Sequence, residues 1–171
     1  LGVVVVANGL LAALILRLFI GAGMEERRLW CWALAPPLVL YVGHNWDMAA
    51  AAFAAGALLL AREGRLAAAA AAAGLGTAAK LFPVLALPLF GLGVLFGEAR
   101  PWPQRLLRAT ALSAAAIGAW GLVNLPVAWF AFDNWSEFYR FSQERQGTVA
   151  SSWDVFANMG WWFTWIAERN D

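Results

Sequence analysis

The chain has 171 residues, of which 62% are hydrophobic and 13% are charged, and its formal net charge is +1. A soluble domain of this size could not hide so much apolar surface, so the composition predicts a polytopic membrane protein. The near-neutral charge gives no reason to expect a nucleic-acid partner. The single cysteine, Cys31, excludes an internal disulfide and a cysteine-based metal site.

The first half of the chain predicts three membrane spans. Residues 1–20 are apolar enough to cross, with Arg17 near one end, where its stem can snorkel toward the headgroups. Residues 29–43 form a short second span that the Pro36-Pro37 pair should kink or break. Residues 48–61 form a third span of mostly small residues, a composition that allows close helix approach.

Residues 66–96 are too long for one span and too short for two ordinary ones. We therefore expect two short helices that turn near residues 77–82. The residues that interrupt the stretch are Gly74, Gly76, Lys80 and Pro83. A basic loop at 97–108 and a last clear span at 109–123 follow, so residues 1–126 are expected to form a helical transmembrane region of about six spans.

Residues 127–171 change character, because tryptophan and phenylalanine alternate there with charges and no clean span occurs. Asn134 and Glu137 have the spacing of a capping box, and the aromatic residues after Asn134 share one side of a helix. The pattern predicts an extracytoplasmic amphipathic segment that lies in the membrane interface. Because the chain opens on Leu1 within an apolar run, we expect it to be an internal piece of a longer protein.

Positive charges predict the orientation of the spans. If the spans alternate, the arginine-containing turns near residues 27–28, 62–65 and 100–108 fall on one side, which the positive-inside rule makes cytoplasmic. The turn at Lys80, residues 44–47 and the aromatic tail then face outward. The unusual polar residues converge on that outer face.

Asp47 and His44 are the candidate catalytic residues. Asp47 directly precedes an apolar helix, so it is an N-cap, a catalytic or ligand-binding group, or both. His44 is a base, a hydrogen-bond donor to a sugar or phosphate, or an interfacial histidine. One histidine and one carboxylate make a poor metal site, so no metal and no cofactor are expected.

Lys80, the only lysine, lies within an apolar run beside a helix break. Such a charge is costly unless it snorkels from a helix end or faces a cavity or an anion, and an ammonium can hold a phosphate. Arg140 and Arg145 in the aromatic tail are either solvated charges or further phosphate ligands. The tryptophans, Trp153 included, form an interface belt or stack on a sugar ring.

Five motifs in order resemble those of bacterial integral-membrane glycosyltransferases. The resemblance is to glycosyltransferase family 87, the polyprenyl-phosphate-mannose-dependent mannosyltransferase-like proteins of the GT-C superfamily, and it covers most of residues 41–153. The motifs are His44-Asn-Trp-Asp47, Gly74-Leu-Gly-Thr-Ala-Ala-Lys80-Leu-Phe-Pro83, Asn124-Leu-Pro126, Phe138-Tyr-Arg-Phe-Ser-Gln-Glu-Arg145 and Ser151-Ser-Trp153.

The resemblance implies a multi-pass enzyme of the bacterial plasma membrane that needs no nucleotide sugar. It would transfer a sugar, mannose by analogy, from a polyprenyl-phosphate carrier to a hydroxyl of a glycolipid or glycan at the extracytoplasmic face. Lys80 and Arg145 would neutralise the donor phosphate, with Arg140 and Trp153 beside it, and a carboxylate would deprotonate the acceptor. GT-C enzymes usually carry that carboxylate in their first extracytoplasmic loop, which would lie upstream of this chain, so Asp47 is then a supporting residue and this piece alone is inactive.

Two other classes of protein remain open. A transporter or flippase-like protein for a lipid-linked substrate would also have broken helices and a lysine at membrane depth. Inverted repeats would favour it, and we find no convincing repeat in the sequence. A structural membrane subunit would tolerate substitution of its polar residues.

Overall fold

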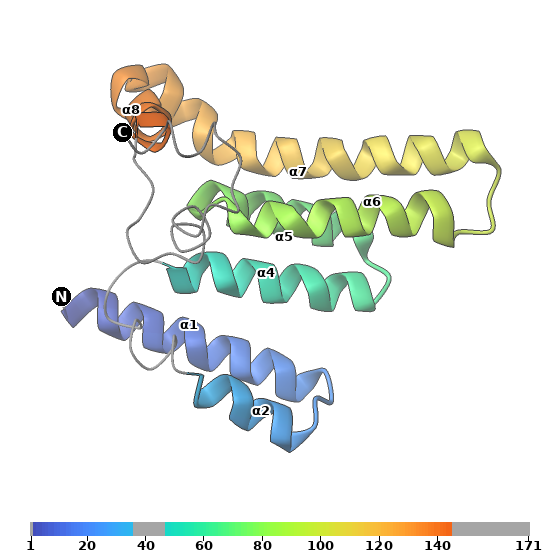
Figure 1. Ribbon diagram of the computed structural model, residues 1–171, viewed down its shortest axis with the longest axis horizontal. Helices are drawn as coiled ribbons and strands as arrows, with labels where there is room; N and C mark the ends of the chain where they lie inside the picture. Colours follow the sequence, from blue (N-terminus) through green and yellow to red (C-terminus); the bar gives the residue numbers. More distant parts are fainter. Residues whose placement is uncertain (1, 36–46, 145–171) are drawn as a thin grey trace, which may run out of the picture. The chain divides into compact units, whose positions relative to one another are not determined.

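Seven α-helices and one short 3-10 helix make up the described part of the chain, residues 2–35 and 47–144 of the computed structural model (Figure 1). The fold of this part is all-α, as the sequence predicts. The elements are α1 (Gly2–Gly21), α2 (Glu26–Ala33), α4 (Asp47–Arg62), α5 (Leu66–Ala79), η1 (Phe82–Leu85), α6 (Ala86–Gly97), α7 (Trp102–Phe130) and α8 (Phe132–Glu144).

The chain divides by its internal contacts into two compact units, Leu1–Pro126 and Val127–Asp171. In the first unit, α1 contacts α4, and α4 packs along most of α5. Because α4, α5, α6 and α7 alternate in direction, the turns at residues 63–65 and 98–101 lie at the same end as the turn at 21–25 (Figure 1). We call this the arginine end, since the arginines of the first unit lie in or near these turns.

Two glycines end helices at the arginine end. Gly23 and Gly64 have φ of 71° and 78°, a conformation that side-chain-bearing residues rarely adopt. In each turn the glycine and the residue after it donate backbone hydrogen bonds to carbonyls in the last turn of the helix, as Gly64 does to Ala61 and Arg65 to Leu60. This is the Schellman pattern, which satisfies the last carbonyls of a helix.

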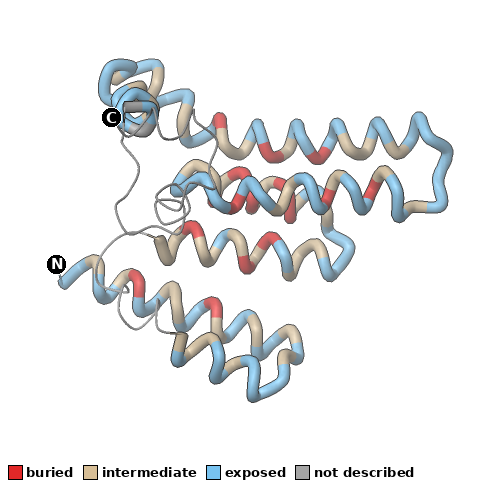
Figure 2. Tube along the Cα trace, in the orientation of Figure 1, coloured by how far each residue is buried: buried red, intermediate tan, exposed pale blue. Residues whose placement is uncertain are grey.

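The buried core of the first unit lies between α4, α5, α6 and α7 (Figure 2). Its members are mostly small, which lets the helix backbones approach closely. They are Ala57, Ala69, Ala70, Ala73, Phe90, Val94, Leu112 and Ala116. Large apolar side chains such as Leu89, Ile117 and Leu122 are instead more than half exposed on the outside of the helices.

Two of the described helices are long and apolar enough to cross a membrane: α1, with 20 residues, and α7, with 29. The apolar helices between them are shorter, since α5 has 14 residues and α6 has 12. The predicted break near residues 77–82 is confirmed, because α5 ends at Ala79 and η1 begins at Phe82. Pro83 occupies one of the first positions of η1, where its missing N–H has no partner to lose.

The structure differs from the sequence-based predictions at four places. Gly74 and Gly76 do not interrupt a helix, since both lie inside α5. The basic loop is shorter than predicted, because α7 already begins at Trp102, and Pro126 lies within α7 instead of ending it. Asn134 does not cap a helix, because α8 begins two residues earlier at Phe132. The Pro36-Pro37 break falls outside the described residues.

Candidate functional site

Asp47 and Lys80 form an ion pair at the end of the first unit opposite the arginine end. Asp47 is the first residue of α4, and Lys80 directly follows the last residue of α5. The two residues are 33 positions apart in sequence, and the antiparallel packing of α4 against α5 brings them to the same level. The ammonium of Lys80 donates to Oδ1 of Asp47.

The backbone of Lys80 is fixed by a hydrogen bond to α5 before it and by the 3-10 turn after it. Its N–H donates to the carbonyl of Gly76 at 2.9 Å, and its extended conformation (φ −161°, ψ 146°) then leads the chain away from α5. Pro83, in the following 3-10 turn, is buried. A Cβ built at Gly76 would lie 2.8 Å from Cβ of Phe53 and 3.0 Å from Pro83, so only glycine fits where these segments meet. Packing therefore fixes where Lys80 leaves the helix.

Both charges stand at helix ends that favour them. A carboxylate at the N-terminus of α4 and an ammonium at the C-terminus of α5 each oppose the partial charge of the helix end. The side chains are 50% exposed for Lys80 and 41% exposed for Asp47, so the pair is not enclosed by protein. An ammonium has three N–H donors, and the contact with Asp47 uses one of them. The remaining donors can bind an anion.

The other charges of the first unit lie toward the arginine end. Glu98 there pairs with Arg100 and with Arg108, both at 3.1 Å, and Arg105 donates to the carbonyl of Leu95 at 2.9 Å. Of the described residues of this unit, Asp47 and Lys80 are the charged ones at the opposite end. Among the described residues of the first unit, this pair therefore supplies the charges at that end.

The structure brings together two of the six predicted site residues, Asp47 and Lys80. Arg140 lies in α8 of the second unit, where its guanidinium pairs with Glu137 three residues earlier and is exposed. His44, Arg145 and Trp153 fall outside the described residues. The proposed roles of all six stay predictions.

The pairing itself was not predicted from the sequence. The similar length of the two helices could have indicated it: Asp47 begins a helix of 16 residues, a short turn follows, and Lys80 directly follows a helix of 14. An antiparallel hairpin with arms of similar length places its two ends together. Among the described side chains there is no group of three His, Cys, Asp or Glu residues that could hold a metal ion.

Comparisons of the sequence and of the structure with known proteins found no relative. No family model matches the chain, and no curated protein or solved structure matches it significantly.

Proposed function

We propose that this chain is part of an integral-membrane glycosyltransferase of the GT-C type. It transfers a sugar, mannose by resemblance, from a polyprenyl-phosphate carrier to an acceptor hydroxyl at the extracytoplasmic face. The observation that carries this proposal is the Asp47–Lys80 pair, in which the Lys80 ammonium is held at the end of apolar helices opposite the arginine end. The membrane-length helices α1 and α7 support the membrane location.

Lys80 is assigned to the donor phosphate. In the transfer, the acceptor oxygen attacks the anomeric carbon, the bond from that carbon to the phosphate oxygen breaks, and polyprenyl phosphate leaves with the electron pair. The ammonium stabilises the negative charge that develops on the leaving phosphate. A second charge-assisted contact to phosphate remains possible while the ammonium stays bound to Asp47.

Asp47 is assigned to positioning Lys80. Its carboxylate contacts the ammonium, so it orients the cation. The acceptor proton passes to a carboxylate base, and under this assignment the base lies on another segment of the protein. Removal of Asp47 should therefore raise KM for the lipid donor more than it lowers kcat, and Asp47→Glu should restore part of the donor affinity.

The transporter alternative has its own supporting observation. Lys80 lies between two apolar helices of less than membrane length, α5 and α6, with the 3-10 turn η1 between them. Broken helices of this kind also form substrate sites near the midplane of secondary transporters. The two functions differ in outcome, since a transporter moves the lipid-linked sugar without breaking the bond between sugar and phosphate.

The test is transfer of radiolabelled mannose from polyprenyl-phosphate-mannose in membranes that express the whole protein encoded by the gene. Lys80→Ala should lower transfer at least about tenfold, the loss expected when one charge-assisted contact to the transition state is removed. Asp47→Ala should lower transfer mainly at low donor concentration, because it raises KM for the donor. Arg27→Ala is the matched control, because it removes an exposed cation at the arginine end.

Unchanged transfer by Lys80→Ala at equal protein level would contradict the assignment of Lys80. If wild-type membranes transfer no sugar but move the labelled lipid between leaflets, and Lys80→Ala stops that movement, the transporter alternative is correct.

A further inference from the structure

A groove between α1 and α4 opens near the arginine end, away from the Asp47–Lys80 pair. Its volume is about 590 Å³, within the range of ligand-binding pockets. The two helices run in the same direction and line the groove with residues at matching spacings. These residues are Leu14, Arg17 and Leu18 of α1 and Gly56, Leu59 and Leu60 of α4.

The groove has apolar walls and a charged mouth. Leucines of both helices form the walls, while Arg17, Arg65 and Glu63 supply the charges. Glu63 lies 3.7 Å from Arg65, and no carboxylate among the described residues pairs with Arg17. Two guanidinium groups and one carboxylate leave one net positive charge, which complements a ligand with a single negative charge next to an apolar chain.

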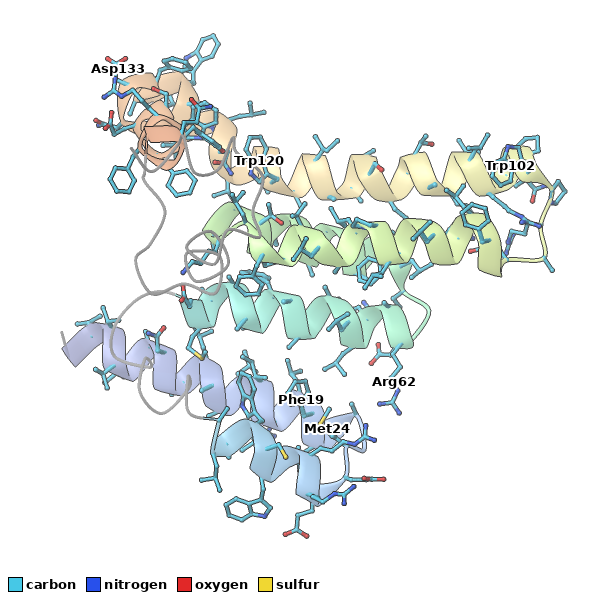
Figure 3. The ribbon with its side chains drawn as sticks, in the orientation of Figure 1. Phe19, Met24, Arg62, Trp102, Trp120 and Asp133 are labelled. Atoms are coloured by element: carbon cyan, nitrogen blue, oxygen red, sulfur yellow. The ribbon has the colours of Figure 1, made fainter. Side chains whose placement is uncertain are left out.

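The packing around the groove keeps it open. Gly56 contributes no side chain to its wall, and a Cβ built there would meet no atom within 4 Å. The opposite side of α1 is occupied, because Phe19 packs edge-on against Trp32 of α2 with ring centres 5.8 Å apart. Arg62, which points from the end of α4 toward the turn after α1 in Figure 3, donates to the carbonyl of Ala22 at 3.0 Å. This bond holds the two helix ends together beside the groove.

We propose that the groove between α1 and α4 binds an anionic glycerophospholipid, with the phosphate at Arg17 and Arg65 and part of an acyl chain along the leucines. A guanidinium binds phosphate through paired N–H donors, and basic pockets between membrane helices on the cytoplasmic side bind anionic headgroups. The inference rests on the membrane placement proposed above but not on sugar transfer. The ligand is a component of the surrounding membrane and differs from the polyprenyl-linked donor assigned to the other end.

The test is native mass spectrometry of the whole protein, purified in detergent and titrated with phosphatidylglycerol, phosphatidylcholine or inorganic phosphate. Phosphatidylglycerol should bind at least about tenfold more tightly than phosphatidylcholine, and Arg17→Gln should remove about tenfold of that affinity. Arg17→Lys should keep most of it. Arg27→Gln, which removes a cation outside the groove, should leave it unchanged.

A second variant tests the groove without changing any charge. Gly56→Leu places a side chain in the space along the wall and should also weaken phosphatidylglycerol binding, whereas Gly118→Leu, at another open glycine on α7, should not. Equal binding of the two lipids, or undiminished binding by Arg17→Gln and Gly56→Leu, would overturn the proposal. Inorganic phosphate that displaces the lipid at similar concentration would also overturn it, because the ligand would then be a free anion.

Extraction with alkaline carbonate tests the membrane placement separately from the lipid site. If alkaline carbonate releases the protein from the membrane fraction, that placement is wrong and the lipid site fails with it. If the protein resists extraction but shows no headgroup preference, only the lipid site is wrong.

Discussion

Gly74 shows how one residue type serves different purposes along this chain. At Gly23 and Gly64 the backbone needs a positive φ, but Gly74 lies within the regular helix α5. A Cβ built at Gly74 would lie 2.2 Å from the carbonyl oxygen of Ala116 in α7. The obstacle is backbone, which cannot turn away as a flexible side chain can. Gly74 is therefore required for the close approach of α5 to α7.

Gly74→Ala should lower the free energy of unfolding by about 1–3 kcal/mol, because α5 and α7 must move apart to admit the methyl group. Gly118→Ala, in α7 with open space around it, is the control and should be neutral or stabilising by up to about 1 kcal/mol, since alanine favours a helix over glycine. Thermal unfolding in detergent measures both. Equal melting temperatures for the two variants would show that the helices do not approach so closely.

The helix pair α4 and α5 illustrates what local sequence leaves undetermined. Residues 67–73 are all alanine, so α5 has nearly the same composition on every side and no apolar stripe marks its packing face. The structure buries Ala69, Ala70 and Ala73 and leaves Ala67 exposed. The neighbouring helices select this face, since Gly74 and the buried alanines allow the closest approach there.

Leucine substitutions along α5 should distinguish its buried face from its exposed face by their effect on stability. Ala70→Leu places a large side chain in the closed core between the helices and should cost about 1–3 kcal/mol of unfolding free energy. Ala67→Leu makes the same chemical change on an exposed position, so its effect should stay within about 0.5 kcal/mol. Melting curves of the two variants test this, and a greater loss for Ala67→Leu would reverse the assignment of the faces.

The first unit as a whole separates its charges by position along the helices. Arginines and their glutamate partners gather in the turns of the arginine end, whereas the described charges at the opposite end are the Asp47–Lys80 pair. If the helices cross a membrane, an excess of arginine favours the cytoplasmic side. The arrangement then directs the pair outward, toward the side on which we propose sugar transfer.

Cysteine labelling of intact cells tests this orientation. In a Cys31→Ser background, Leu81→Cys, beside Lys80, should react with an impermeant maleimide added outside. Glu63→Cys, in the turn between α4 and α5, should react only after permeabilisation, because that turn belongs to the arginine end. Labelling of both positions from the same side would contradict a membrane-crossing hairpin and, with it, the outward placement of Lys80.

The sequence by itself determines the all-α class, the polar turn at residues 62–65 and the break near residues 77–82, because these depend on hydropathy and on residues that restrict the backbone locally. It also marks Asp47 and Lys80 as rare charges in apolar surroundings. The predictions that Gly74 interrupts a helix and that Asn134 caps one were wrong, because glycine and asparagine are compatible with either a helix end or a helix interior.

Only the tertiary structure decides that Asp47 and Lys80 meet, which alanines are buried, and where a groove opens beside Arg17. Each of these features joins segments distant in sequence. The free energy that selects them comes from close contacts between helices, and a run of alanines carries almost no record of such contacts along the chain.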